Sequence, residues 1–362
     1  MNRSRSNAWF IMLLGIILII PASFVILKPY INTENYENRE LAKFPSPGEV
    51  SWYKMPKALD DYVLDHFPYR NYFVLTNSLI NTEIFDDNPG KNTIKGREGW
   101  IFYTGENNNS LMQYKGVSTY SEEQLERIAD NLIASRDYLG ERDCSFILFI
   151  APNKERVYSE YMPDEIKRSS EYCNTDQLIG YLNENTDIKV IWAYESLMEY
   201  KGRNPDMPLY YHYDTHWNNL GAFTGVKALC DELSVDIPGV SLERNGNSSY
   251  DLADYSGLRL VLTGKDTDYD ILGLNDEYEI EEEEINGRFI FHNSGEDERR
   301  LMVLRDSFAI NMRSCLGSLF NETDMPHRNV FEQSMIDDFN PDIFVYETCE
   351  RDLDRLLDFR LE

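Results

Sequence analysis

Residues 301–308 read LMVLRDSF, in which the apolar residues 301–304 are followed by Arg305, Asp306 and Ser307. A continuous apolar run is typical of a strand that is covered on both faces of a sheet. The residues that follow, 309–320, are expected to form a helix. A serine at a sharp strand-to-helix turn has an exposed hydroxyl, and the helix N-terminus directs N–H groups at a developing oxyanion. The stretch therefore predicts a nucleophile elbow or, taken alone, an ordinary N-capping serine.

Three further apolar runs predict partners for this strand. They lie at residues 146–150, 188–193 and 342–346, and helical stretches separate them. Ahead of the first run, Ser121 and Gln124 have the spacing of a capping box at the start of a helix. Strands that alternate with helices predict an α/β fold with a doubly wound, mostly parallel sheet and helices on both faces, which makes three layers.

The N-terminal segment predicts how the chain is oriented relative to the membrane. Residues 8–27 are apolar or small throughout, and Arg3 and Arg5 precede them. About 20 apolar residues in a helix span a hydrocarbon core of roughly 30 Å, and the positive-inside rule keeps the short N-terminus in the cytoplasm. We therefore expect residues 1–30 to hold one transmembrane anchor in the cell membrane, with the rest of the chain periplasmic or at the cell surface. A cleaved signal peptide is the alternative.

The remaining residues divide into a leader and a larger domain. Residues 31–104 predict an extended segment with helices that pack on a catalytic domain, and residues 105–362 predict that domain. The chain is 42% hydrophobic and 13% aromatic, which is enough for a substantial core. An acidic run at 276–284 predicts a solvated loop or the edge of a hairpin.

Charge and cysteine content exclude several classes of function. The formal net charge is −28, which argues against a nucleic acid partner because nucleic acids bind basic surfaces. The five cysteines have no C-x-x-C spacing, which argues against zinc-ribbon and thioredoxin sites. We expect most of them to be buried single thiols, although an exported domain allows some to pair. No nucleotide or nicotinamide fingerprint is present, and no cofactor is expected.

A second segment supplies partners for a serine nucleophile. Residues 210–218 read YYHYDTHWN. An aspartate two residues before a histidine can accept a hydrogen bond from the imidazole and stabilise the imidazolium. Asp214 and His216 are therefore candidates for an orienting carboxylate and a general base, and Trp217 for a wall that excludes water.

Two alternatives apply to the same segment. An isolated D-x-H pattern also fits a buried structural histidine. His212, Asp214 and His216 together offer donors that suit zinc, but the sequence has only five histidines and no obvious fourth ligand. We therefore expect no metal here.

Together, the two segments resemble the AlgX/AlgJ-like alginate O-acetyltransferase family. The SGNH-hydrolase-like domain of that family has a D-x-H-W motif upstream of a G-D-S-F-like motif, and this chain has DTHW at 214–217 and RDSF at 305–308. Other blocks are similar in order and spacing, and they lie at 37–45, 66–70, 99–103, 150–158 and 341–351. The resemblance covers most of the chain after the predicted anchor and implies an SGNH-like fold.

The resemblance also implies roles for individual residues. It makes Ser307 the nucleophile, His216 the general base and Asp214 the group that orients the imidazole. Arg305 stands where the family usually has glycine, so Arg305 is expected to alter the turn or cover the pocket.

Further candidates lie outside these motifs. Asn153 and Lys154 follow the strand predicted at 146–150 and are candidates for completing the oxyanion hole. Arg351 is a candidate for binding substrate.

The function that the resemblance implies is an extracytoplasmic O-acetyltransferase. Ser307 would carry the acetyl group to hydroxyls of an exopolysaccharide or cell-wall polymer, and a membrane-bound acyltransferase would supply it. One alternative is an esterase that uses the same triad to remove acetyl groups. The other is an inactive module that binds polysaccharide within an assembly.

Overall fold

A computed structural model describes most of the chain. The described residues are 9–12, 14–15, 19, 23, 26–36, 40–46, 48–90, 92–105, 110–246, 250–274, 281–285, 287–293 and 297–362. Among these residues, no helix combines the length and the apolar character needed to cross a membrane. Part of the anchor predicted over 8–27 lies outside the described residues, as do residues 37–39 of the first family-like block and residues 276–280 of the acidic run.

The chain forms two compact units. The smaller is Met1–Lys91 with Ala253–Thr263, and the larger is Asn92–Leu252 with Gly264–Glu362. The division falls ahead of the boundary expected at residue 104. The reason is that β1 (Thr93–Lys95) and β2 (Ile101–Tyr103) form a hairpin, and the Trp100 and Phe102 side chains of this hairpin are buried in the core of the larger unit.

Helices dominate the smaller unit. Its elements are η1 (Lys28–Tyr30), α2 (Met55–Asp65), α3 (Arg70–Glu83), α11 (Arg259–Leu262) and the end of α10 (Asp251–Tyr255). The inserted segment is attached to α3, where the Ser78 hydroxyl donates to the Ser256 carbonyl at 2.6 Å. Gly257 has a φ of +72°, and a Cβ there would meet the Val74 and Ser78 side chains, so this position requires glycine.

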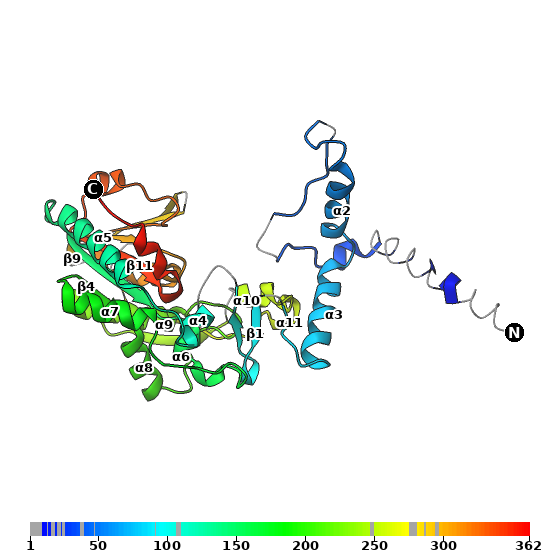
Figure 1. The fold of residues 1–362 in the computed structure, drawn as a ribbon, viewed down its shortest axis with the longest axis horizontal. Coiled ribbons are helices and arrows are strands. Elements are labelled where there is room, and N and C mark those ends of the chain that lie inside the picture. Colours follow the sequence, from blue (N-terminus) through cyan, green and yellow to red (C-terminus); the bar gives the residue numbers. More distant parts are fainter. Residues whose placement is uncertain are drawn as a thin grey trace. The chain divides into compact units, whose positions relative to one another are not determined.

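A seven-stranded sheet forms the centre of the larger unit. Its order is β4-β3-β11-β9-β10-β8-β7, and β11, the last strand in the chain, lies between β3 and β9. Strands β4, β9 and β11 of this sheet are labelled in Figure 1. The strands are β3 (Ser145–Ala151), β4 (Lys189–Trp192), β7 (Glu281–Ile285), β8 (Arg288–His292), β9 (Asp297–Leu304), β10 (Phe320–Pro326) and β11 (Ile343–Cys349). The pairs among β4, β3, β11, β9 and β10 are parallel, which confirms the expected mostly parallel α/β sheet.

Side chains alternate between the two faces of this sheet. In β3, Ile147 and Phe149 enter one buried cluster, whereas Phe146 and Leu148 enter the other. Helices α8 (Tyr194–Arg203), α9 (Asn219–Leu233) and α12 (Arg313–Leu319) contribute to the first cluster. Helices α5 (Glu122–Gly140), α7 (Asn174–Asn185), α13 (Ser334–Phe339) and η5 (Glu350–Leu357) contribute to the second. The alternation produces the three predicted layers.

The remaining elements of the larger unit are short. They are β1 (Thr93–Lys95), η2 (Arg97–Gly99), β2 (Ile101–Tyr103), α4 (Ser110–Tyr114), α6 (Lys154–Val157), η3 (Ser159–Tyr161), η4 (Phe308–Met312) and the paired strands β5 (Ser241–Asn245) and β6 (Asp268–Leu272). All five cysteines are buried free thiols, as expected for most of them.

Two features at the C-terminal part of the sheet differ from the sequence expectation. The helix expected over 309–320 begins as the 3-10 turn η4, and Phe320 already belongs to β10. Strands β10 and β8 were not expected, because polar residues interrupt the apolar pattern of β10 and because β8 has only three consecutive apolar residues, 289–291. The described acidic residues 281–284 belong to β7, the last strand in the sheet order, which matches the expected hairpin edge.

Candidate active site

Ser307 lies just beyond β9, where the strand turns into η4. Asp306 holds this turn, because its carboxylate accepts from the N–H of Phe308 at 2.7 Å and from the N–H of Cys349 at 2.8 Å. Burial alone would raise the pKa of Asp306, but Arg328 and these two N–H groups hold it below the usual value. An ionised Asp306 therefore fixes the elbow to the end of β11.

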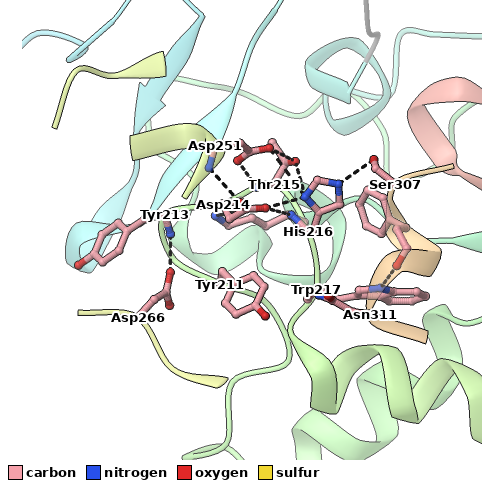
Figure 2. Close-up of polar contacts among 12 residues, drawn as sticks. Tyr211, Tyr213, Asp214, Thr215, His216, Trp217, Asp251, Asp266, Ser307 and Asn311 are labelled. Atoms are coloured by element: carbon pink, nitrogen blue, oxygen red, sulfur yellow. Dashed lines mark hydrogen bonds and ion pairs between the residues drawn. The ribbon is translucent and has the colours of Figure 1, made fainter. Parts of the chain in front are cut away.

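The loop before α9 brings the other two predicted residues to Ser307. The Nε2 of His216 lies 2.8 Å from the Ser307 Oγ, and its Nδ1 lies 2.6 Å from an Asp214 carboxylate oxygen. Figure 2 shows the imidazole between the other two side chains. Because a carboxylate only accepts, Nδ1 carries the proton and Nε2 is free to accept the serine proton. The arrangement is that of a Ser-His-Asp triad.

A second carboxylate, which the sequence did not predict, stands beside the triad. Asp251 accepts from the Thr215 hydroxyl at 2.6 Å and from the Thr215 N–H at 2.7 Å. One of its oxygens lies 3.8 Å from the Nδ1 of His216, and its own N–H donates to Asp214 at 2.9 Å (Figure 2). The residue belongs to no motif, so only its spatial position identifies it.

These charges set the protonation of the imidazole. Burial alone would lower the pKa of His216, but Asp214 and then Asp251 outweigh burial and the nearby Arg351, so the pKa is raised above its usual value. Burial and the charge of Asp214 raise the pKa of Asp251 to about 6. Above that pH, Asp251 is a carboxylate that favours the imidazolium.

We expect Asp251→Asn to shift the acid limb of the activity profile to lower pH. His216 must be neutral to accept the Ser307 proton, so activity rises as pH passes the raised pKa of the imidazole. Removing the Asp251 charge lowers the pKa of His216, so the acid limb of the activity profile moves to lower pH. The measurement is kcat/KM against pH for hydrolysis of an acetyl-ester reporter.

The control for this variant is Asp270→Asn, which neutralises an exposed carboxylate on β6 and should leave the limb in place. An acid limb that stays put or moves to higher pH in Asp251→Asn would contradict the electrostatic assignment.

The aromatic wall of the imidazole is Phe308, whose ring centroid lies 4.8 Å from that of His216. Trp217, which the sequence suggested for this wall, is fully buried and supports the site from beneath. Its indole N–H donates to the Phe308 carbonyl at 2.9 Å, and Asn311 donates to the Trp217 carbonyl at 2.7 Å. Trp217 therefore joins the histidine loop to the serine turn (Figure 2).

Asn153 and Lys154 do not present side chains to an oxyanion at Ser307. The Asn153 amide donates to Gln113 at 2.6 Å, and Lys154 donates to three backbone carbonyls. Both residues are buried. The described contacts of both side chains lie away from Ser307 and give no support to the prediction that one of them completes the oxyanion hole.

Arg305 is turned away from the serine. Its guanidinium donates to the carbonyls of Met325 at 3.1 Å, Gly287 at 2.9 Å and Asp306 at 3.3 Å. It also lies over the Phe289 ring at 4.3 Å. Arg305 is 3% exposed, so it does not cover the pocket and instead ties the elbow to the β8–β10 part of the sheet.

We expect Arg305→Ala to destabilise the fold by about 2–4 kcal/mol, because buried carbonyls lose their donor. Activity per folded molecule should change little. Thermal unfolding and reporter turnover measure the two effects. Arg313→Ala is the matched control, since Arg313 lies over the same ring at 5.0 Å but is more exposed. Unchanged stability in Arg305→Ala would refute this role.

Two other predicted groups are placed as follows. Arg351 lies over the Phe308 ring at 5.0 Å, with one nitrogen 3.5 Å from the Thr215 hydroxyl, so its charge is beside the triad. The Nδ1 of His212 pairs with Asp266 at 3.1 Å. The group whose ligand atom lies close to those of Asp214 and His216 is the Asp251 carboxylate, and not His212 as the H-x-D-x-H spacing suggested.

Comparison with known sequences matches the part of the chain that contains Asp214 and His216 and ends before Ser307. The family model for the SGNH hydrolase-like domain of acetyltransferase AlgX matches residues 93–251. A probable alginate O-acetylase AlgJ from Pseudomonas putida is 24% identical over 182 residues, which cover 50% of this chain and 44% of that protein. Over the matched residues, the chain is similar to the AlgX/AlgJ-like family. It spans about half the length of the curated AlgJ relatives that it matches.

Solved structures share the fold of this AlgX/AlgJ-like chain. Bacillus cereus PatB1 with a sulfonyl adduct has a TM-score of 0.52 at 15% identity, and the match covers 74% of this chain and all of PatB1. A DHHW family protein from Eubacterium siraeum has a TM-score of 0.51 at 13% identity, over 75% of this chain and 99% of that one. At these identities the likeness shows the fold alone.

Proposed function

We propose that this protein is an extracytoplasmic O-acetyltransferase that modifies hydroxyls of a polysaccharide. The observation that carries the proposal is the hydrogen-bonded series from Ser307 through His216 to Asp214, at 2.8 Å and 2.6 Å, at the carboxyl end of a central strand. Active sites of open α/β sheets lie at this edge. The similarity to alginate O-acetylases supports acetyl as the group transferred and a polysaccharide as its acceptor.

The first half-reaction would form an acetyl-enzyme. His216 takes the Ser307 proton while Oγ attacks the acetyl carbonyl, and the imidazolium then gives that proton to the departing group of the donor. The Ser307 N–H is a candidate oxyanion donor. Within the described part of the chain it donates to no protein acceptor, whereas the Phe308 N–H is held by Asp306.

The second half-reaction would release the acetyl group to the acceptor. The acceptor hydroxyl gives its proton to neutral His216 and attacks the acetyl carbonyl, and Ser307 recovers its proton as the ester bond to the enzyme breaks. Water in place of the sugar would make the same site an esterase. We further propose that a membrane-bound acyltransferase supplies the acetyl group, as the family resemblance implies.

The test incubates the purified full chain with an acetyl-ester reporter, with and without oligosaccharide acceptors, and follows products by mass spectrometry. We expect an acetylated oligosaccharide and a transient acetyl group on the peptide that contains Ser307. Free acetate as the sole product at every acceptor concentration would favour the esterase. No turnover and no acetylated peptide would favour the inactive binding module.

The location is tested separately by protease accessibility in intact cells or spheroplasts. A domain that stays protected from protease would contradict the extracytoplasmic proposal.

A further inference from the structure

Lys154 is a buried charged residue to which the two half-reactions assign no role. It begins α6 directly after β3 and is 1% exposed. Its ammonium nitrogen lies 2.7 Å from the Ile101 carbonyl oxygen, 2.9 Å from that of His212 and 3.0 Å from that of Asp214. The rings of Trp100 and Phe102 lie about it at 5.1 Å and 5.2 Å. Burying a lysine in this way requires partners for every N–H.

Two of these carbonyls, those of His212 and Asp214, belong to the loop that carries Asp214 and His216. The His212 carbonyl also accepts the Ile101 N–H at 3.1 Å, so strand β2 and Lys154 hold the same point of the loop. The Asp214 carbonyl is held by Lys154 while the Asp214 side chain accepts from His216. The position of the orienting carboxylate therefore depends on the ammonium group.

The number of acceptors matches the ammonium form. An ammonium has three N–H groups and no lone pair, and it faces three carbonyl oxygens. A neutral amine has only two N–H groups, so its lone pair would face the third carbonyl. Loss of the proton therefore leaves one buried carbonyl without a donor and opposed by a lone pair.

We propose that Lys154 is a positioning residue that keeps the Asp214–His216 pair aligned with Ser307, and that it does so only as an ammonium. The inference rests on the proposed function for its kinetic readout. It goes beyond that function by assigning the alkaline limit of activity to a group that touches neither substrate nor the reacting atoms.

The surroundings of Lys154 place the loss of its ammonium proton within the pH range of an activity assay. Burial lowers the pKa of Lys154 to about 8, against the charges of Asp266 ahead of β6, Glu155 on α6, Asp251 on α10 and Asp214 on the loop. An unfolded lysine has a pKa of about 10.4. Between these values the unfolded chain binds more protons than the folded one, so this group does not favour unfolding as pH rises. Activity should therefore fall while the protein stays folded.

The experiment compares the wild-type full chain with Lys154→Met, Lys154→Arg and Lys201→Met. The readouts are kcat and KM for the acetyl-ester reporter from pH 6 to 10, with circular dichroism as the check on folding. We expect wild-type kcat to fall above about pH 8 with an unchanged spectrum. In Lys154→Met, kcat should fall about 100-fold at pH 7.5, with KM within about threefold, since small misplacements of reacting groups have effects of that size.

The other two variants separate the charge from the general effect of losing a lysine. Lys154→Arg keeps its charge at every pH used, so it should retain more kcat than Lys154→Met and lack the alkaline limb near pH 8. Lys201→Met is the matched control. Lys201 also donates to a carbonyl, that of Val157 at 2.6 Å, pairs with Glu160 at 2.6 Å and lies over the Tyr158 ring. None of these described contacts is with the loop that carries Asp214 and His216. The kcat of Lys201→Met should stay within about twofold of wild type, because the contacts that it loses lie outside the site.

Several results would overturn the proposal. A folded Lys154→Met with near wild-type kcat would do so, as would an alkaline limb that persists in Lys154→Arg. If Lys154→Met does not fold, a wild-type kcat that stays constant from pH 7.5 to 9.5 would be sufficient to overturn the proposal.

A failure of the proposed function is recognised independently. If the wild type turns over the reporter no faster than Ser307→Ala, the catalytic proposal fails. The role of Lys154 is then judged by the rate at which a sulfonyl fluoride labels Ser307, read by mass spectrometry. Equal labelling rates in the wild type and a folded Lys154→Met would refute the positioning role.

Discussion

Ser307→Ala is expected to abolish acetyl transfer, lowering kcat by a factor on the order of 10⁴ or more. The variant removes the oxygen that would carry the acetyl group, so no acetyl-enzyme can form. The fold should be unaffected, because the half-buried Ser307 hydroxyl contacts only His216 among the hydrogen bonds described, and the turn is held by Asp306. The measurements are acetylated oligosaccharide by mass spectrometry and thermal unfolding of the same preparation.

Comparison with His216→Ala tests whether the residues act as a unit. Each single variant should lose about as much activity as the double variant, because members of a triad are not additive. Full polymer modification in cells that carry only Ser307→Ala would refute catalysis and favour the binding module.

Asp214→Asn is expected to lower kcat by about 10³–10⁴-fold, which is less than the loss in Ser307→Ala or His216→Ala. An amide in place of the carboxylate can donate to Nδ1 and so favour the wrong tautomer, which leaves Nε2 protonated and unable to accept from Ser307. The loss should be smaller than that of Ser307→Ala, because the nucleophile and the imidazole remain. The measurement is kcat for the reporter at the pH optimum of the wild type.

The structure adds a reason why this effect should be large. Asp214 also accepts the His216 N–H at 3.0 Å and the Asp251 N–H at 2.9 Å, so it shapes the loop as well as the imidazole. Asp266→Asn is a useful comparison, because Asp266 accepts from the backbone of the same loop at His212 and Tyr213 without reaching His216. A loss in Asp214→Asn no greater than in Asp266→Asn would show that loop shape, not the tautomer, explains the effect.

The central part of the fold could be predicted because local sequence determines it. Strands β3, β9 and β11 each contain a continuous apolar run, at 146–151, 301–304 and 343–346, which a sheet covered on both faces can bury. Strand β10 could not be predicted in this way. Its sequence is FNETDMP, and its polar Asp324 is buried because Arg288 of β8 pairs with it. A pairing between distant residues leaves no periodic pattern in either segment.

The motifs of the triad could also be recognised within short stretches of sequence. The D-x-H spacing places a carboxylate within reach of an imidazole on one loop, and the Asp-Ser pair after an apolar strand predicts the elbow. The contacts around the triad join residues that are distant in the chain, so no short stretch of sequence predicts them. Arg305 follows a strand just as a pocket residue would, yet its guanidinium enters the sheet, because the carbonyls of Gly287 and Met325 are brought to it by the β8–β10 pairing.

The sequence by itself determined the α/β class, the identity of Ser307, His216 and Asp214, and the order in which they occur. The class follows from the burial pattern of the strands, and the three residues follow from the D-x-H-W and Asp-Ser motifs together with their resemblance to a known family. Only the tertiary structure decided that Asp251 stands beside the imidazole, that Phe308 packs on it and that Lys154 holds the Asp214 carbonyl. Those contacts join segments that are remote in the chain, and the sheet order that brings them together is fixed by packing across the whole unit and not by any one segment.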